Sequence, residues 1–514
     1  MAILHASEPY YRFVVLFFNC MLTFGTYFCF DMPSVLQGVF QGNITCVNAS
    51  QHSNESDCEE GLGMSYVQYN LLYAIYAWTN AVVVIGAGFL IDKLGNPVGL
   101  FIFSSLCLSG SCIFALGASL KGTPAMFPVM LFGRLLFGSG NGSLTIVQNR
   151  ITAFWFKNKE LAFAFGITLT FSRLGSVLNF FFTKEFEDAM GLMWTLWGGA
   201  ILCLTGFLAA IVTSIMDTSG VKQLGMEDEV KENSKKVRLR DILEFTLPYW
   251  LLALSIMFFY NGVFPFVADA SDFIQQKYDY STKSPVPAYL AGAVYDASLV
   301  LSPFLGVLID QFGMRGILAL TCAIATLPVF GLLAFTTVFP LVSTLWLGVT
   351  YSFAAASLWP SIPLVVSQST VGTAMGITTS IQMVGIGISN VVIGAILGDA
   401  NKQTTEETLH KWTLTMIYLF ANIGACVVTT ILLNIADSRR GRVLNQSKKQ
   451  RLAVAHQRLQ EEIDDGNEPI TDYVAHQRLQ EEIDDGNEPI TDYVDSFEPD
   501  PLLIPPRGTI NRKI

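Results

Sequence analysis

Long apolar runs recur along the chain, and polar residues are concentrated in the short segments between them. A helix of about 20 apolar residues is long enough to cross the hydrocarbon core of a bilayer. The runs cover roughly residues 13–35, 66–91, 98–119, 125–148, 161–183, 194–216, 247–268, 287–309, 316–337, 341–362, 373–397 and 412–435. This pattern predicts an all-α membrane protein with about twelve transmembrane helices.

A short motif that occurs twice closes one apolar run in each half of the chain. The sequence GFLIDKLG occupies residues 88–95, and GVLIDQFG occupies residues 306–313. Two matched helix ends of this kind indicate an internally duplicated protein whose halves rock against each other. We expect Asp92, Asp310 and Arg315 to act in gating by latching these helix ends on the cytosolic side.

The duplication predicts the domain organisation. Parallel repeats relate the two halves of major facilitator transporters, so we expect that fold, with two pseudo-symmetric six-helix bundles. The bundles are expected at residues 1–216 and 247–436, with a cytosolic linker at 217–246 and a tail at 437–514.

Composition supports a membrane protein and argues against an enzyme. Hydrophobic residues make up 51% of the chain and charged residues only 14%, whereas a soluble domain carries about 25% charged residues. The sequence has five histidines, and it contains no HExxH, phosphate-binding loop or CxxC motif. We therefore expect no catalytic site, no cofactor, no metal and no nucleic-acid partner. Any transport would run on the gradient of a substrate or an ion.

Basic residues and glycosylation motifs predict the orientation. Lys and Arg after the fourth and eighth spans, in the linker and after the last span all fall on one side if both termini are cytosolic. The opposite loop, 38–65, carries three glycosylation sequons. Their acceptors are Asn43, Asn48 and Asn54. Cys46 and Cys58 in the same loop are placed to pair in an oxidising compartment.

The tail reads as disordered and acidic. Residues 455–474 recur unchanged at 475–494, and the repeat is rich in Glu, Asp, Gln and Gly. Beyond the repeat, Glu498, Leu502 and Leu503 fit an acidic dileucine pattern. That pattern resembles the address by which clathrin adaptors send membrane proteins to endosomes and lysosomes, so we expect a lysosomal or late endosomal location.

Two charges lie near the middle of expected spans. A charge at this depth costs roughly 2.5–3.5 kcal/mol on insertion scales and therefore calls for a partner. Arg173 suits a carboxylate, because its guanidinium makes two parallel hydrogen bonds; a structural ion pair is the open alternative. Asp296 is the expected protein partner, and an Arg173–Asp296 pair would close the cavity without substrate. Asp296 is alternatively placed to meet a cationic group of the substrate.

Further polar residues in the spans are candidates for gating or binding. Asp31 precedes Pro33 near the lumenal end of the first span, where it is placed to cap or gate that end. Arg134 is expected to brace the cytosolic helix ends near Asp92. Neutral hydrogen-bonding and aromatic surface in the cavity is expected from Asn80, Tyr260, Trp359 and Gln382. The Trp359-Pro360 pair predicts a kink in the tenth span.

Motifs in both halves resemble one family. They include FGTYFCFDMP at 24–33, LLYAIYAWTN at 71–80, WFKNKEL at 155–161, SRLGS at 172–176, LPYW at 247–250, VFPF at 263–266, LWP at 358–360, GTAMG at 372–376 and SIQ at 380–382. In these the chain resembles the lysosomal dipeptide uniporter group of the major facilitator superfamily. The resemblance implies export of dipeptides from lysosomes by alternating-access uniport. It also implies that Arg173 binds the peptide carboxylate, with Asn80, Trp359 and Gln382 near the cavity.

The chain departs from this family in two respects. Where the family has Gly-Gly-Glu-Ser, the chain has Gly140-Asn141-Gly142-Ser143, so the acid that would meet a peptide ammonium is absent. We expect Asp296 or Asp31 to compensate. The family also relies on a glycosylated single-span accessory subunit, and three candidate glycans on this chain reduce the expected need for it.

Two other functions remain open. A proton-coupled carrier of another small organic anion would use Arg173 for the anion and Asp296 for the proton. A non-transporting scaffold or receptor would instead use the duplicated tail as its working part.

Overall fold

The computed structural model of the chain describes residues 5–6, 8–42, 44, 61–156, 161–224, 245–281, 284–366, 371–398, 405–447 and 450. These residues form helices and short connections, with no strand among them, so the predicted all-α fold is confirmed. Several predicted features lie outside the described residues: Asn43, Asn48, Asn54, Cys46, Cys58, the repeat in the tail, and Glu498, Leu502 and Leu503. The side chains of Asp92 and Asp310 also lie outside them.

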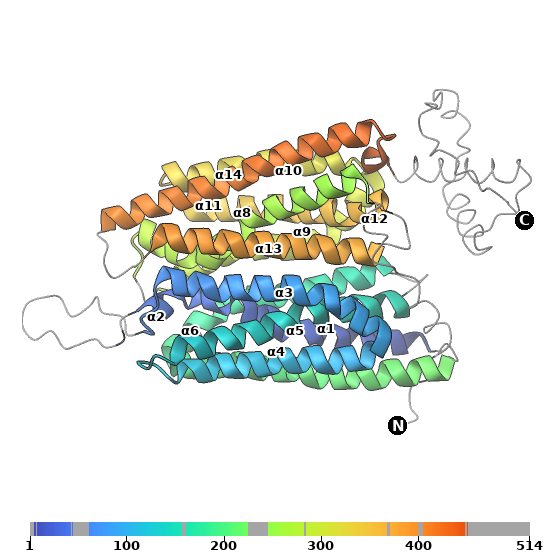
Figure 1. Cartoon of the computed structure of the whole chain (residues 1–514), viewed down its shortest axis with the longest axis horizontal. Coiled ribbons are helices and arrows are strands. Elements are labelled where there is room, and N and C mark those ends of the chain that lie inside the picture. The colour runs from blue at the N-terminus through green and yellow to red at the C-terminus, as the bar shows by residue number, and fades with distance from the viewer. Residues whose placement is uncertain are drawn as a thin grey trace, which may run out of the picture.

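The first half contains a series of long helices and one short one (Figure 1). They are α1 (Pro9–Val35), α2 (Gln37–Gln41), α3 (Tyr66–Leu94), α4 (Asn96–Ala118), α5 (Met126–Trp155) and α6 (Leu161–Leu224). A capping box begins α3: Ser65 Oγ accepts from the Gln68 N–H, and Gln68 Oε1 accepts from the Ser65 N–H.

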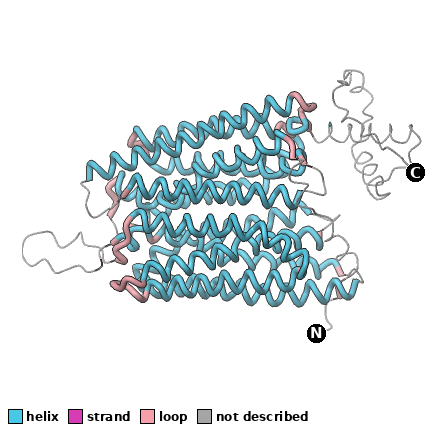
Figure 2. Tube along the Cα trace, viewed as in Figure 1, coloured by secondary structure: helices cyan, strands magenta, loops and turns pink. Residues whose placement is uncertain are grey.

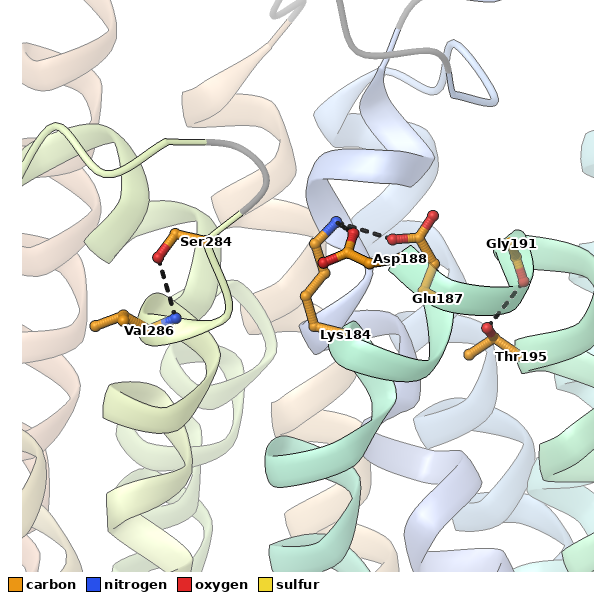
Figure 3. Close-up of polar contacts among 7 residues, drawn as sticks. All are labelled: Lys184, Glu187, Asp188, Gly191, Thr195, Ser284 and Val286. Atoms are coloured by element: carbon orange, nitrogen blue, oxygen red, sulfur yellow. Dashed lines mark hydrogen bonds and ion pairs between the residues drawn. The ribbon is translucent and has the colours of Figure 1, made fainter.

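The helix α6 is two helices separated by a break at Gly191. This residue has φ 80° and ψ 163°, a backbone conformation that glycine adopts without a Cβ clash. Figure 3 shows the last turn before the break, where Lys184 pairs with Glu187 at 2.9 Å and with Asp188 at 3.4 Å. After the break, Thr195 Oγ1 donates to the Gly191 carbonyl at 2.9 Å. The segment 184–188, expected in a loop, thus extends the helix to the break.

The second half repeats the arrangement of long helices. It contains α8 (Leu247–Lys277), α9 (Val286–Phe312), α10 (Arg315–Phe335), α11 (Pro340–Leu358), α12 (Ile362–Val365), α13 (Val371–Leu397) and α14 (Thr405–Ser438). A 3₁₀ turn at Trp359–Ser361 separates α11 from α12, at the position where the sequence predicts a kink. Pro360 lacks the N–H that an uninterrupted helix needs at this point.

Nine of the described helices are long and apolar enough to cross a membrane. This count takes α6 once, although Gly191 divides it, and it omits α5 and α9. The helix α5 carries polar residues such as Asn141 and Gln148, and only Val286–Ser302 of α9 is counted, as a shorter apolar helix. Dividing α6 and including α5 and α9 gives the twelve helices that the sequence predicts.

The two halves lie side by side along their length. In Figure 1 the helices of the first half, blue to green, occupy one side, and those of the second half, green-yellow to red, occupy the other. They meet where α3 packs against α13, α6 against α9, and α1 against α8. Figure 2 shows that short connections join the helices at two ends. We call the end at which α2 lies the α2 end. We call the opposite end, at which α1 begins and α14 ends, the terminal end.

Close helix packing depends on glycines that face each other across α4 and α5. A Cβ at Gly110 would lie 2.5 Å from the backbone nitrogen of Phe137, and one at Gly133 would lie 2.7 Å from that of Phe114. Backbone atoms cannot rotate away as side chains do, so this contact requires residues without a Cβ. Small residues allow the same close approach in membrane helices generally.

We predict that Gly110→Ala destabilises the protein, because the added Cβ pushes α4 and α5 apart; overpacking typically costs about 1–3 kcal/mol. The measurement is the thermal midpoint of the detergent-solubilised protein. Gly331→Ala in α10 is the matched control, since nothing lies within 4 Å of the added Cβ. Equal midpoints for the two variants would contradict this explanation.

Candidate functional site

The site is centred on Arg173, a buried arginine on α6 that is held by tyrosines of the other half. Its guanidinium carbon lies 4.9 Å from the ring centroid of Tyr351 on α11 and 5.6 Å from that of Tyr295 on α9. Its Nη2 also donates to the Tyr351 hydroxyl. Within the described residues, Arg173 Nε has no hydrogen-bond partner. The arginine therefore joins the two halves and keeps one unused donor.

Aromatic residues continue the site across the interface between the halves. Tyr260 packs edge-on against Tyr351 with ring centroids 5.8 Å apart, and it accepts a 2.8 Å hydrogen bond from Trp359 Nε1. Phe264, one turn beyond Tyr260 on α8, lies 6.3 Å from the ring of Phe30 on α1. The predicted residues Tyr260 and Trp359 therefore lie together, beside the arginine-bearing cluster.

Asp31 is a buried carboxylate near the end of α1. Its Oδ1 accepts a 3.2 Å hydrogen bond from the hydroxyl of Tyr295, whose ring also faces Arg173. Asp31 lies close to the hydroxyl of Ser176 as well, but its Oδ2 completes no hydrogen bond in the described part of the chain. Tyr295 thus contacts both Asp31 and Arg173. Asp31 Oδ2 and Arg173 Nε remain without a hydrogen-bond partner among the described residues.

The expected Arg173–Asp296 ion pair is not formed. Successive residues of an α-helix point about 100° apart, so Tyr295, which faces Arg173, directs its neighbour Asp296 elsewhere. Asp296 is half-buried, and no hydrogen bond or ion pair joins it to another described residue. The partners of Arg173 are tyrosine side chains rather than a carboxylate.

The expected contact between Arg134 and the helix ends near Asp92 is also wrong. Arg134 lies in the first third of α5, near the α2 end, whereas Asp92 lies at the terminal end of α3. Arg134 Nη1 and Nη2 donate to the carbonyls of Cys29 and Phe30 at 3.4 and 3.2 Å. Pro33 explains this contact, because it has no N–H to donate to the Cys29 carbonyl one turn earlier. The guanidinium of Arg134 also faces the rings of Tyr73, Phe114 and Phe137.

The space beside Gly142, where the family acid is absent, is filled by another side chain. A Cβ at Gly142 would lie 1.9 Å from Asn80 Oδ1. Asn80 is buried on α3, and its Oδ1 has no partner within the described residues. The amide of Asn80 therefore occupies the position into which a side chain on α5 would extend. Gln382 is also buried, on α13, the helix that packs against α3.

Arg315 is a further predicted gating residue whose contact the structure describes. It is buried at the start of α10, and its Nη1 donates to the Pro360 carbonyl at 2.6 Å. It thus ties α10 to the 3₁₀ turn that separates α11 from α12. The roles of Asp92 and Asp310 stay predictions.

At the α2 end the halves are joined by a set of hydrogen bonds that we call the clasp. Ser34 Oγ donates to the Val267 carbonyl at 2.5 Å, and the Tyr69 hydroxyl donates to the Ala268 carbonyl at 2.7 Å. The other members are Gln37, Tyr66 and Asn70 of the first half and Asp269, Asp272 and Gln276 of the second. The two halves are therefore closed against each other at this end.

Sequence reasoning missed the tyrosines and the acids of the clasp. Tyr295 directly precedes the recognised Asp296, so the opposite face of the same helix turn was the available signal. Asp269 and Asp272 fell just beyond the expected end of the span at 268. The helix in fact continues to Lys277, so these acids lie inside it. Two acids three residues apart on one helix face were the signal for this pair.

Comparisons with known proteins identify the family to which this helical fold belongs. A family model for the Major Facilitator Superfamily matches residues 13–390. The lysosomal dipeptide transporter MFSD1 of Homo sapiens is 31% identical over 461 residues, covering 88% of this chain and 91% of that protein. MFSD1 of Danio rerio is 33% identical over 399 residues, covering 75% and 81% respectively.

Solved structures support the fold alone. A proton-dependent oligopeptide transporter aligns with a TM-score of 0.59 at 14% identity, covering 83% of this chain and 100% of that one. At this identity the similarity extends to the arrangement of the helices and carries nothing about the substrate.

We predict that Arg134→Met destabilises the protein by about 1–3 kcal/mol, because the Cys29 carbonyl, which lacks a helical donor at Pro33, loses the donor from Arg134. In a Pro33→Ala background the loss is expected to be smaller, since the substituted alanine supplies an N–H to the Cys29 carbonyl. Thermal midpoints of the four proteins in this double-mutant cycle provide the measurement. Additive effects of the two substitutions would show that Arg134 does not compensate for Pro33.

Proposed function

The chain belongs to the Major Facilitator Superfamily and, within it, to the group of the relatives named MFSD1, and on this premise we propose that it carries dipeptides across the lysosomal membrane. The proposed mechanism is alternating-access uniport, in which the substrate gradient alone drives net flux. Membrane transport follows from the family, whereas the substrate and the absence of a coupling ion are specific to this proposal.

The observation that carries the proposal is the Arg173–Tyr295–Asp31 arrangement at the interface between the halves. A dipeptide with free ends carries a carboxylate and an ammonium. An arginine fork suits the carboxylate, since it presents two parallel N–H donors. We assign Asp31 to the ammonium because its Oδ2, which has no partner among the described residues, is available to accept a hydrogen bond. The negative charge of a carboxylate also complements the positive charge of an ammonium.

The assignment of Asp31 follows from the environment of Gly142. The amide of Asn80 fills the space that an acid on α5 would need, so the ammonium must be met from another helix. Of the two compensating acids considered, Asp31 is linked to Arg173 through Tyr295, whereas Asp296 is not. We therefore propose that Asn80 lines the site as a neutral group, near Trp359, Tyr260 and Gln382.

The same contacts supply a coupling between binding and rocking of the halves. Arg173 of the first half is bound to Tyr351 of the second. A substrate carboxylate that takes the arginine releases this hydroxyl, so binding changes which contacts hold the halves together. A ligand shifts a conformational equilibrium only through such differential contacts. With the clasp closed, the structure represents the state that is shut at the α2 end.

Orientation and partners complete the proposal. We propose that the α2 end faces the lumen and that both termini are cytosolic, as the distribution of basic residues indicates. Glycans on Asn43, Asn48 and Asn54 and a Cys46–Cys58 disulfide would then lie in the lumen. Clathrin adaptors would read Glu498, Leu502 and Leu503, and an accessory single-span subunit would cover the lumenal face.

We predict that Arg173→Lys lowers dipeptide counterflow in proteoliposomes by about tenfold or more, because lysine offers a point charge in place of a fork. Asp31→Asn is expected to lower it comparably. Asp296→Asn, the same chemical change at an acid outside the cluster, is the matched control and should retain most of the flux. Loss of flux in Asp296→Asn with normal flux in Asp31→Asn would reverse the assignment.

Capped competitors sharpen this test. For the wild-type protein, an N-acetylated dipeptide and a C-terminally amidated one should both compete poorly with labelled dipeptide. In Asp31→Asn the difference between free and N-acetylated competitors should collapse, while discrimination against the amide remains. Unchanged discrimination against the N-acetylated competitor would remove Asp31 from the ammonium site.

We predict that an imposed pH gradient does not drive accumulation of dipeptide when its concentration is equal on both sides. Accumulation, abolished by Asp296→Asn, would instead establish the proton-coupled carrier.

Deleting residues 455–494 should leave counterflow unchanged, because a carrier does not need the repeat. Loss of function with intact flux after this deletion would favour the scaffold.

A further inference from the structure

The clasp at the α2 end contains a buried carboxyl group, that of Asp269, with one oxygen that has no hydrogen-bond partner among the described residues. Asp269 lies on α8 at the interface between the halves and is 2% exposed. Gln37 Nε2 donates to its Oδ1 at 2.7 Å, and Asn70 Nδ2 donates to the same oxygen at 3.3 Å. Both donors come from the first half, so this environment exists only while the halves are in contact.

Three oxygen atoms around this carboxyl have no donor. They are Asp269 Oδ2, Gln37 Oε1 and Asn70 Oδ1, and all three are buried without a hydrogen-bond partner in the part of the chain that the structure describes. Acceptors buried in this way cost free energy. Because a protonated carboxyl donates through its O–H, one proton on Oδ2 supplies a donor for an amide oxygen and removes the negative charge.

The neighbouring acid Asp272 has a different environment. The Tyr66 hydroxyl donates to its Oδ2 at 2.8 Å, and Gln276 Nε2 donates to its Oδ1 at 2.8 Å. Both oxygens accept, as suits an ionised carboxylate. Asp269 and Asp272 are three residues apart on one helix face, where two negative charges repel. The proton is therefore placed on Asp269, whose second oxygen lacks a donor.

The groups that face Asp269 offer it no cation among the described residues. The titratable ones are Asp272 on α8 and Tyr66, Tyr69 and Tyr73 on α3. Tyr73 also lies in the field of Asp31 on α1, and the Arg134 guanidinium of α5 lies 5.3 Å from the Tyr73 ring. Arg134 is bound to the α1 carbonyls, and α2 and α13 bring neutral side chains to this end.

We propose that Asp269 is a proton-binding site that is complete only when the clasp is closed. The proton resides on Oδ2 and donates to one of the amide oxygens of Gln37 or Asn70. It is taken from solution at the α2 end when the halves close and returns to that solution when they separate. No net proton transfer across the membrane results, so the device regulates conformation without coupling.

The sign of the pH effect follows from linkage. The closed state binds this proton more strongly than the open state, so lowering pH at the α2 end favours closure and raising it favours opening. For one proton the closed-to-open ratio changes by up to about tenfold per pH unit within the window between the two affinities. The inference rests on the alternating-access transport proposed above. It predicts that an acidic lumen biases the carrier toward its cytosol-open state.

The test measures the separation of the halves at the α2 end as pH is varied. Spin labels are placed on the full-length protein at Thr123→Cys, between α4 and α5, and Thr337→Cys, between α10 and α11, with other accessible cysteines replaced. Both positions are exposed and lie at the α2 end of opposite halves. Electron–electron distance distributions in lipid nanodiscs without substrate, from pH 5 to 8, should shift from short to long distances.

Asp269→Asn is the decisive variant, because an amide donates and accepts without titrating. It should keep the short distance throughout the pH range. Asp188→Asn is the matched control: Asp188 lies at the same end, but it is solvent-accessible and pairs with Lys184 (Figure 3). It should respond to pH as the wild type does. Asp272→Asn should shift the distribution toward longer distances at every pH while retaining the pH dependence.

Several outcomes would overturn the proposal. A wild-type distance that ignores pH, or a pH response unchanged in Asp269→Asn, would show that Asp269 does not bind the proton. A shift that follows sodium at constant pH would assign the three oxygens to a metal cation, since carboxylate and amide oxygens also suit such ions. The readout contains no substrate, so absence of dipeptide flux alongside the expected pH shift would refute the proposed substrate and leave this inference intact.

Discussion

Arg173 is a buried cation whose partners lie across the interface between the two halves. A guanidinium buried within a membrane bundle must be satisfied by other groups of the protein, and here the hydroxyl and rings of Tyr351 and Tyr295 meet that requirement. Because these tyrosines belong to the second half, the arginine is satisfied only while the halves are in contact, or when a ligand replaces them. The proposed binding site and the contact between the halves therefore share the same atoms.

The other two arginines buried within the described residues, Arg134 and Arg315, hydrogen-bond to backbone carbonyls of their own half. Arg134 donates to the Cys29 carbonyl, which Pro33 leaves without a helical donor, and Arg315 donates to the carbonyl of Pro360 at the break after α11. A lipid environment provides no water for such groups, so breaks in membrane helices need donors from neighbouring helices. Each half thus keeps hydrogen-bond donors for the carbonyls at its helix interruptions.

The contacts between the halves differ in kind along the interface. Around Arg173, aromatic rings from α1, α8 and α11 pack against one another, and Tyr295 joins Arg173 to Asp31. At the α2 end, Ser34 and Tyr69 donate to backbone carbonyls of α8, and Gln37 and Tyr66 donate to the carboxyl groups of Asp269 and Asp272. Hydrogen bonds of this type are individually modest and can be exchanged for water when the halves part.

The sequence by itself determined the number of long helices, the duplication and the exceptional nature of Arg173 and Asp31. These properties depend on local composition, since hydrophobic length and the cost of a buried charge are set residue by residue. Only the tertiary structure decided the partners. The rotation of α9 turns Tyr295 rather than Asp296 toward Arg173, and the direction of α5 brings Arg134 to Pro33 instead of Asp92. Asn80 beside Gly142 and Gln37 beside Asp269 come from distant parts of the chain. Such contacts depend on which helix faces face each other, and no local pattern contains that information.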